Sequence, residues 1–172
     1  MNPYNCNKPK WEPEKWNLSE KEHDLTNCYS YAFDTIIKEG ERDRKLQPGE
    51  LSGNKFVNYD CNSIINKVKK DYALLGIRKL EDMYEEIECT NYRIALVVDN
   101  KGDNIDYHFY RQDSNNKWSH KAGDSEVSNV DASNNFIIDP EKADRNYNKY
   151  NNNNYNYSIF CGYYSVPYTK SL

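Results

Sequence analysis

The residues in this sequence with the clearest capacity for chemistry are one cysteine, Cys28, and two histidines, His108 and His120. A thiol nucleophile needs a base that takes its proton and a third group that orients the base. The third histidine, His23, stands in a charged stretch, where we expect it to be exposed. The sequence therefore predicts Cys28 as nucleophile, His108 as general base and His120 as orienting group.

Cys28 stands where the sequence predicts the first turn of a helix over about residues 28–39. Thr26 or Asn27 supplies the N-cap, and apolar residues follow at helical spacing. The dipole of a helix favours a thiolate at its N-terminus, so we expect a lowered pKa for Cys28. The alternative is that Cys28 is a small buried hydrophobic residue on a core helix.

Two alternating segments, 105–112 and 117–121, predict a β-hairpin that carries both candidate histidines. If the strands pair symmetrically about Ser114, His108 and His120 lie directly opposite each other, with Cβ atoms about 5 Å apart. A hydrogen bond between the two rings would then orient His108. A loop of two or four residues would shift the register by one and break this opposition. The alternative is a pair of structural or surface histidines on a tyrosine-rich sheet.

The remaining elements must position these residues. Two more helices are expected at about 60–75 and 79–87, and further strands at 92–98, 136–139 and 157–166. Helices followed by an antiparallel meander are typical of an α+β domain, with N-terminal helices packed on a C-terminal sheet. We expect an irregular arm over 1–22 and a single α+β catalytic-type domain over 23–168, with an Asn/Tyr-rich loop at 146–156.

Composition excludes several functional classes. The 172 residues carry a net charge of −4 and no long basic stripe, so nucleic-acid binding is disfavoured. No apolar run approaches the roughly 20 residues that span a bilayer, and no apolar signal-peptide segment is visible at the N-terminus. The five cysteines include no C-x-x-C pair, so a zinc knuckle or thioredoxin motif is not expected, and because five is an odd number at least one thiol is free in the monomer. The default expectation is a reducing, cytoplasmic location, with release by a route other than Sec left open.

The order and spacing of the candidate residues resemble the NlpC-type branch of the papain-like thiol peptidases. The resemblance covers about residues 26–40 and 91–122. It implies a papain-like fold, with Cys28 as nucleophile, His108 as base, His120 as orienting group and the Cys28 backbone N–H in the oxyanion hole. It also implies peptidoglycan-type peptides as the first substrate class to try.

The main prediction is a cysteine-dependent hydrolase of amide, peptide or isopeptide bonds that works through an acyl-thioenzyme without a cofactor. A thiol acyltransferase is the closest alternative. A carboxylate could replace His120 as orienting group, the candidates being Asp113, Asp131 and Asp139. Cys61, at another predicted helix start, is the alternative nucleophile, and Cys28 with the two histidines could instead bind zinc.

A different class of function rests on the aromatic composition. Sixteen tyrosines and five phenylalanines make up most of the 14% aromatic content. Tyrosine has an apolar ring and a polar tip, which suits it to recognition surfaces. The alternative hypothesis is therefore a non-catalytic tyrosine-rich module that binds a protein or a glycan.

Overall fold

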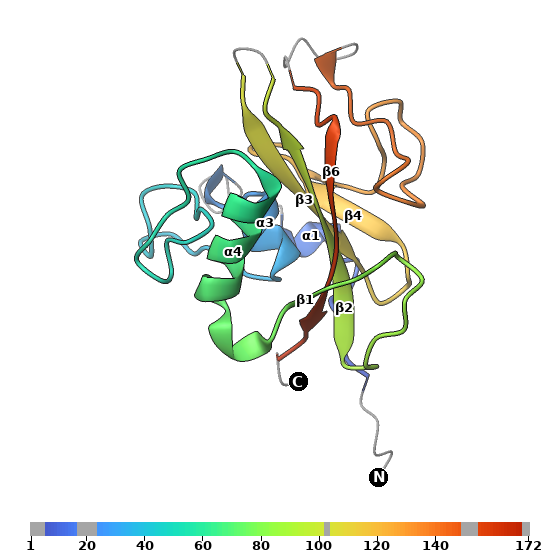
Figure 1. Ribbon diagram of the computed structural model, residues 1–172, viewed down its shortest axis with the longest axis horizontal. Helices are drawn as coiled ribbons and strands as arrows, with labels where there is room; N and C mark the ends of the chain where they lie inside the picture. Colours follow the sequence, from blue (N-terminus) through green and yellow to red (C-terminus); the bar gives the residue numbers. More distant parts are fainter. Residues whose placement is uncertain (1–5, 17–23, 102–103, 149–154, 170–172) are drawn as a thin grey trace.

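A six-stranded antiparallel sheet forms the centre of the structure, with the strand order β1-β6-β2-β3-β4-β5 (Figure 1). The computed structural model describes residues 6–16, 24–101, 104–148 and 155–169. The strands are β1 (Arg78–Lys79), β2 (Asn91–Asp99), β3 (Asp106–Gln112), β4 (Trp118–Lys121), β5 (Val127–Ser128) and β6 (Ile159–Pro167). The helices are α1 (Pro13–Trp16), α3 (Cys28–Ala32), α4 (Cys61–Asp71) and a 3₁₀ turn, Ala73–Leu75.

The predicted α+β fold of helices packed on a sheet is wrong, because the described chain is dominated by its sheet. The helices α1, α3 and α4 have only 4, 5 and 11 residues. The papain-like, NlpC-type arrangement of helices on a sheet, expected as part of that fold class, is wrong for the same reason.

Two expected helices fail for local reasons. The helix expected over 28–39 ends at Ala32, because Asp34 adopts a φ of 50° that cannot continue an α-helix. The helix expected over 79–87 does not form. There the Asp82 carboxylate accepts hydrogen bonds from the backbone N–H groups of Tyr84 and Glu85, which competes with helical pairing.

Several element positions are confirmed. The helix α4 begins after an Asp60 N-cap, whose carboxylate accepts from the Ser63 N–H at 2.8 Å. The strands β2, β3, β4 and β6 form within a residue or two of the predicted segments. The strand expected over 136–139 is wrong, since that stretch contributes only an isolated bridge between Val130 and Phe136.

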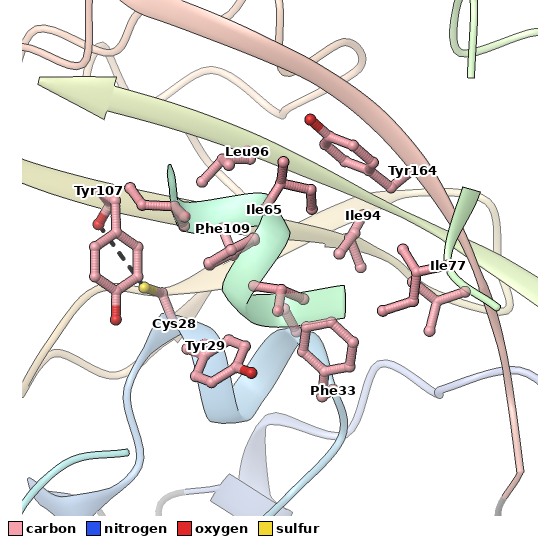
Figure 2. Close-up of a cluster of buried hydrophobic side chains, with 14 of the residues drawn as sticks. Cys28, Tyr29, Phe33, Ile65, Ile77, Ile94, Leu96, Tyr107, Phe109 and Tyr164 are labelled. Atoms are coloured by element: carbon pink, nitrogen blue, oxygen red, sulfur yellow. Dashed lines mark hydrogen bonds between the residues drawn. The ribbon is translucent and has the colours of Figure 1, made fainter. Parts of the chain in front are cut away.

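Side chains alternate across β3, and this alternation separates two hydrophobic clusters. Tyr107 and Phe109 face α3 and α4, in the cluster shown in Figure 2. Tyr110 packs on the other face, in a cluster that continues under the segment between β5 and β6. That second cluster also contains the aromatic residues Trp118, Tyr157 and Tyr163.

Two disulfides close long stretches of the chain. Cys6 pairs with Cys89 and Cys61 pairs with Cys161, at sequence separations of 83 and 100 residues. Cys28 is the free thiol that the odd count required. Disulfides form and persist in oxidising compartments, so the expected reducing, cytoplasmic setting is not supported.

The division into an arm and a domain stays a prediction. The described part of the arm, 6–16, is attached to the sheet, because the Ser114 N–H donates to the Pro9 carbonyl at 2.7 Å. His23 and part of the 146–156 loop lie outside the described residues. Within the described ranges, no helix has the length and apolar character needed to span a membrane.

Candidate functional site

Cys28 is the first residue of α3, as the sequence predicts. Asn27 is the N-cap: its side-chain oxygen accepts from the Ser30 N–H at 3.0 Å, and its side-chain nitrogen donates to the Leu46 carbonyl at 2.8 Å. The thiol is buried, with 6% of the residue exposed. Its Sγ points to the backbone carbonyl oxygen of Tyr107, 4.0 Å away (Figure 2).

The predicted lowering of the Cys28 pKa is wrong. Burial raises the pKa of this thiol to about 12, and the nearby Asp106 carboxylate adds to the rise. Backbone N–H groups of Phe109 and Tyr29 oppose the shift without reversing it. A helix of five residues carries a small dipole, so the cost of a buried charge outweighs it. Cys28 is therefore a protonated thiol at neutral pH.

The β3–β4 hairpin has a different register from the expected one. Arg111 pairs with Ser119, so the hairpin is centred on Asn115 and not on Ser114. The cause is the connecting loop, in which Asn116 adopts the left-handed conformation with a φ of 62°. A left-handed residue at the end of a three-residue loop is a common hairpin closure.

The shift by two positions leaves both histidines on one face, as diagonal neighbours. In this register His120 lies opposite Tyr110, and their ring centroids are 5.2 Å apart. The expected direct opposition of His108 and His120 is therefore wrong. Diagonal neighbours on one face remain within reach of long side chains, and His108 Nε2 lies 2.9 Å from His120 Nδ1.

The hydrogen bonds fix the tautomers of both rings. His120 Nε2 is 3.0 Å from the Val130 carbonyl oxygen, which can only accept, so this nitrogen carries the proton. His120 Nδ1 then accepts, and His108 Nε2 donates to it. Burial lowers the pKa of both histidines, and the neighbouring His120 lowers that of His108 further. His108 is thus a neutral ring whose Nδ1 is an acceptor.

These buried neutral histidines predict that the protein loses stability in mild acid. The unfolded chain binds protons near the ordinary histidine pKa of about 6.5. The folded chain binds them only at lower pH. Stability should therefore fall as the pH drops below about 6.5, by up to about 1.4 kcal/mol per pH unit for each histidine.

Calorimetric unfolding of the wild type and of His108→Gln between pH 7.5 and 5 measures this dependence. The carboxylates contribute equally to both proteins, so the difference isolates the His108 ring. The variant should lose stability less steeply than the wild type. Parallel curves would contradict the assignment of a neutral buried His108.

The structure brings the two histidines together but does not pair them with the thiol. Cys28 packs on the α3 side of β3, with Tyr107 and Phe109. His108 contacts Tyr157 on the opposite side, at a centroid distance of 5.4 Å. Among the described residues, no hydrogen bond joins Cys28 to either histidine. The catalytic roles assigned to these residues stay predictions.

One cavity nevertheless reaches both sides of β3. It has a volume of about 440 Å³ and lies at the N-terminal end of this strand, away from the residue pairs with β4. Its lining includes Asn27, Cys28, Lys45, Gln47, Asp106, Tyr107, His108, residues 122–125, Tyr147, Tyr155 and Tyr157. Sequence reasoning missed the last three tyrosines, because Tyr147 and Tyr155 were assigned to a low-complexity loop and Tyr157 to the start of the last strand. The alternate spacing of Tyr155 and Tyr157 was the available signal for a shared face.

The other sequence candidates have structural partners. The three carboxylates proposed as orienting groups have other hydrogen-bond donors. Asp113 accepts from Arg111 and Ser119, and Asp139 accepts from Tyr163. Asp131 accepts from the backbone N–H groups of Ser133, Asn135 and Asp144. Cys61 is in a disulfide and is not a nucleophile. No cluster of three or more His, Cys, Asp or Glu residues suited to a metal ion occurs in the described part of the chain.

The comparison with known proteins adds one relative. Insoluble matrix shell protein 1 of Ruditapes philippinarum is 36% identical to this chain over 136 residues, which cover 79% of the chain and 81% of the relative. The chain belongs to the family of this shell matrix protein. No family model and no solved structure matches the sequence.

Membership of this family corrects the predicted class of protein. The relative is named as a shell matrix protein, and the fold of this chain is dominated by its sheet. The classification as a hydrolase, thiol protease or papain-like α+β protein is therefore not supported. The resemblance to NlpC-type peptidases is not addressed by this relative and stays a prediction.

Proposed function

We propose that this chain is a non-catalytic structural component of an insoluble extracellular matrix. The observation that carries the proposal is the 36% identity to a shell matrix protein over most of both chains. The level and extent of identity make a shared structural role the simplest inference. This role corresponds to the non-catalytic alternative raised by the tyrosine-rich composition.

The disulfides and the state of Cys28 support the proposal. Two disulfides suit an oxidising, extracellular setting. The free thiol is buried, protonated and directed at a backbone carbonyl. A thiol acyltransferase, which the sequence left open, needs a base hydrogen-bonded to the sulfur, and among the described residues no hydrogen bond joins Cys28 to either histidine.

Fractionation of the source organism tests the role. Peptides of this chain should be found by mass spectrometry in the extracellular residue that resists acid and detergent extraction. Recombinant oxidised protein should bind this insoluble extracellular material. The Cys28→Ser variant should bind it equally well, whereas reduced and alkylated protein should not bind it. Recovery of the chain only from the cytosolic fraction would refute the proposal.

The reactivity of Cys28 provides a second measurement. With a pKa of about 12, roughly one Cys28 thiol in 10⁵ is ionised at pH 7. Iodoacetamide should therefore label Cys28 far more slowly than it labels the amino acid cysteine in solution. The rate should rise about tenfold per pH unit in the alkaline range. Intact-mass spectrometry follows the reaction, with Cys28→Ser as the control that takes no label. Complete labelling within minutes at pH 7 would instead favour an activated nucleophile.

A further inference from the structure

The cavity beside Cys28 and His108 is walled by aromatic rings. Four tyrosines line it, of which Tyr155 and Tyr157 have nearly parallel rings, 13° apart with centroids separated by 6.0 Å. Its volume of about 440 Å³ falls within the range of roughly 300–1,000 Å³ that is usual for small-ligand sites. Flat apolar walls of this kind suit a ring-shaped ligand with apolar faces.

The polar groups of the cavity fit a neutral ligand that donates hydrogen bonds. The Lys45 ammonium is paired with the Asp124 carboxylate at the wall. The Asp106 carboxylate accepts from the Tyr157 hydroxyl at 2.7 Å, and the nearby Lys45 opposes its charge. Lys121, whose Nζ donates to the Gly123 carbonyl of the wall, lies close to Lys45 and Asp124, so two ammonium groups and two carboxylates are near the cavity. The acceptors include the Asp106 carboxylate, which already accepts from Tyr157, and the Nδ1 of His108. The described residues give this ring nitrogen no hydrogen-bond donor.

From this geometry we propose that the cavity binds a sugar unit of a neutral polysaccharide. A pyranose ring presents apolar C–H faces to tyrosine rings and hydroxyl donors to fixed acceptors. The inference rests on the proposed matrix role for the source of the polysaccharide. The neutral polysaccharide would be the matrix component to which the chain is attached.

Two other occupants fit less well. A lysine side chain would meet the ammonium of Lys45 in the lining, and Lys121 lies next to that lining, with its Nζ donating to the Gly123 carbonyl. A peptide added as a strand needs a run of free backbone, but the N-terminal end of β3 offers few residues and residues 122–125 enclose the cavity there. A neutral saccharide meets neither obstacle.

Binding is tested on the full oxidised chain with two soluble probes, a β-1,4-linked glucose tetramer and a β-1,4-linked N-acetylglucosamine tetramer. Calorimetry should detect at least one of them. The free thiol Cys28 lines the cavity and reports the location of binding. A bound tetramer should slow its modification by methyl methanethiosulfonate at pH 9, in proportion to occupancy.

Variants separate this cavity from the rest of the surface. Tyr155→Ala should weaken binding by about tenfold or more, and Tyr155→Phe should restore most of it, because the ring face is retained. Ser125→Trp, at an exposed position of the lining, should block entry without disturbing the core. Tyr84→Ala, at a tyrosine 74% exposed and outside this lining, is the matched control and should bind normally.

Three results with the tetramers would overturn the proposal, and a fourth comes from a peptide probe. The three are the absence of binding by both tetramers up to about 10 mM, binding that leaves Cys28 unprotected, and equal binding by the Ser125→Trp variant. Protection of Cys28 by a short lysine-containing peptide and by neither tetramer would assign the cavity to a protein partner and overturn it as well. None of these results bears on where the chain is deposited, so the matrix role is judged separately.

Discussion

Arg111→Met should destabilise the folded protein by about 3–5 kcal/mol, the usual cost of leaving buried charges without their partner. Arg111 is completely buried in β3. Its guanidinium donates to the Asp113 carboxylate at 2.9 Å, to the Asp34 carboxylate at 3.3 Å and to the Tyr31 carbonyl at 3.1 Å. The substitution leaves two buried carboxylates without this partner.

The same side chain joins three parts of the chain. Arg111 Nη2 donates to the Lys10 carbonyl of the N-terminal arm at 3.1 Å and to the Tyr31 hydroxyl of α3 at 3.0 Å. The guanidinium also stacks on the Tyr31 ring, 4.0 Å from its centroid. Loss of Arg111 should therefore loosen the arm as well as the core.

Urea denaturation followed by circular dichroism measures the cost. Arg44→Met is the matched control, since Arg44 also pairs with a carboxylate, that of Glu50, but its side chain is 61% exposed. An exposed ion pair contributes about 0–1 kcal/mol, so the control should remain near wild-type stability. Adding Asp113→Asn to Arg111→Met should recover part of the loss, because one buried charge is removed. Equal effects of Arg111→Met and Arg44→Met would contradict the network.

Removal of the Cys61–Cys161 disulfide should have the next largest effect. The bond connects α4 to β6 across a separation of 100 residues, and both cysteines pack in the cluster beneath α4. Cross-linking residues this far apart removes unfolded-state entropy worth about 4–5 kcal/mol. We therefore expect Cys61→Ala/Cys161→Ala to lower the free energy of unfolding by about that amount.

Denaturation with and without a reducing agent checks this prediction. The wild type should lose stability on reduction. The double variant should lose less, since only the Cys6–Cys89 bond remains to be reduced. A double variant as stable as the oxidised wild type would show that the bond adds nothing to folding.

The sequence by itself determined the elements whose causes lie within a few residues. Asn27 and Asp60 are N-caps, and α3 and α4 begin directly after them as predicted. A mostly apolar run located β2, because a strand buried on both faces needs such a run, and alternating residues located β3. The sequence also placed His108 and His120 on one face of the hairpin, although the register that brings their rings into hydrogen-bonding distance differs from the expected one.

The tertiary structure decided everything that depends on distant neighbours. The local rule for a helix N-terminus predicts a thiolate at Cys28, but Tyr107 and Phe109, about 80 positions away, bury the sulfur and reverse the shift in its pKa. The disulfide partners were likewise unreadable from spacing. The faces of β3 determined which cluster each side chain joins, since Cys28 packs with Tyr107 and Phe109 and His108 contacts Tyr157 on the other side. A one-dimensional pattern records the type of each residue, whereas charge state and pairing are set by what packs against it in three dimensions.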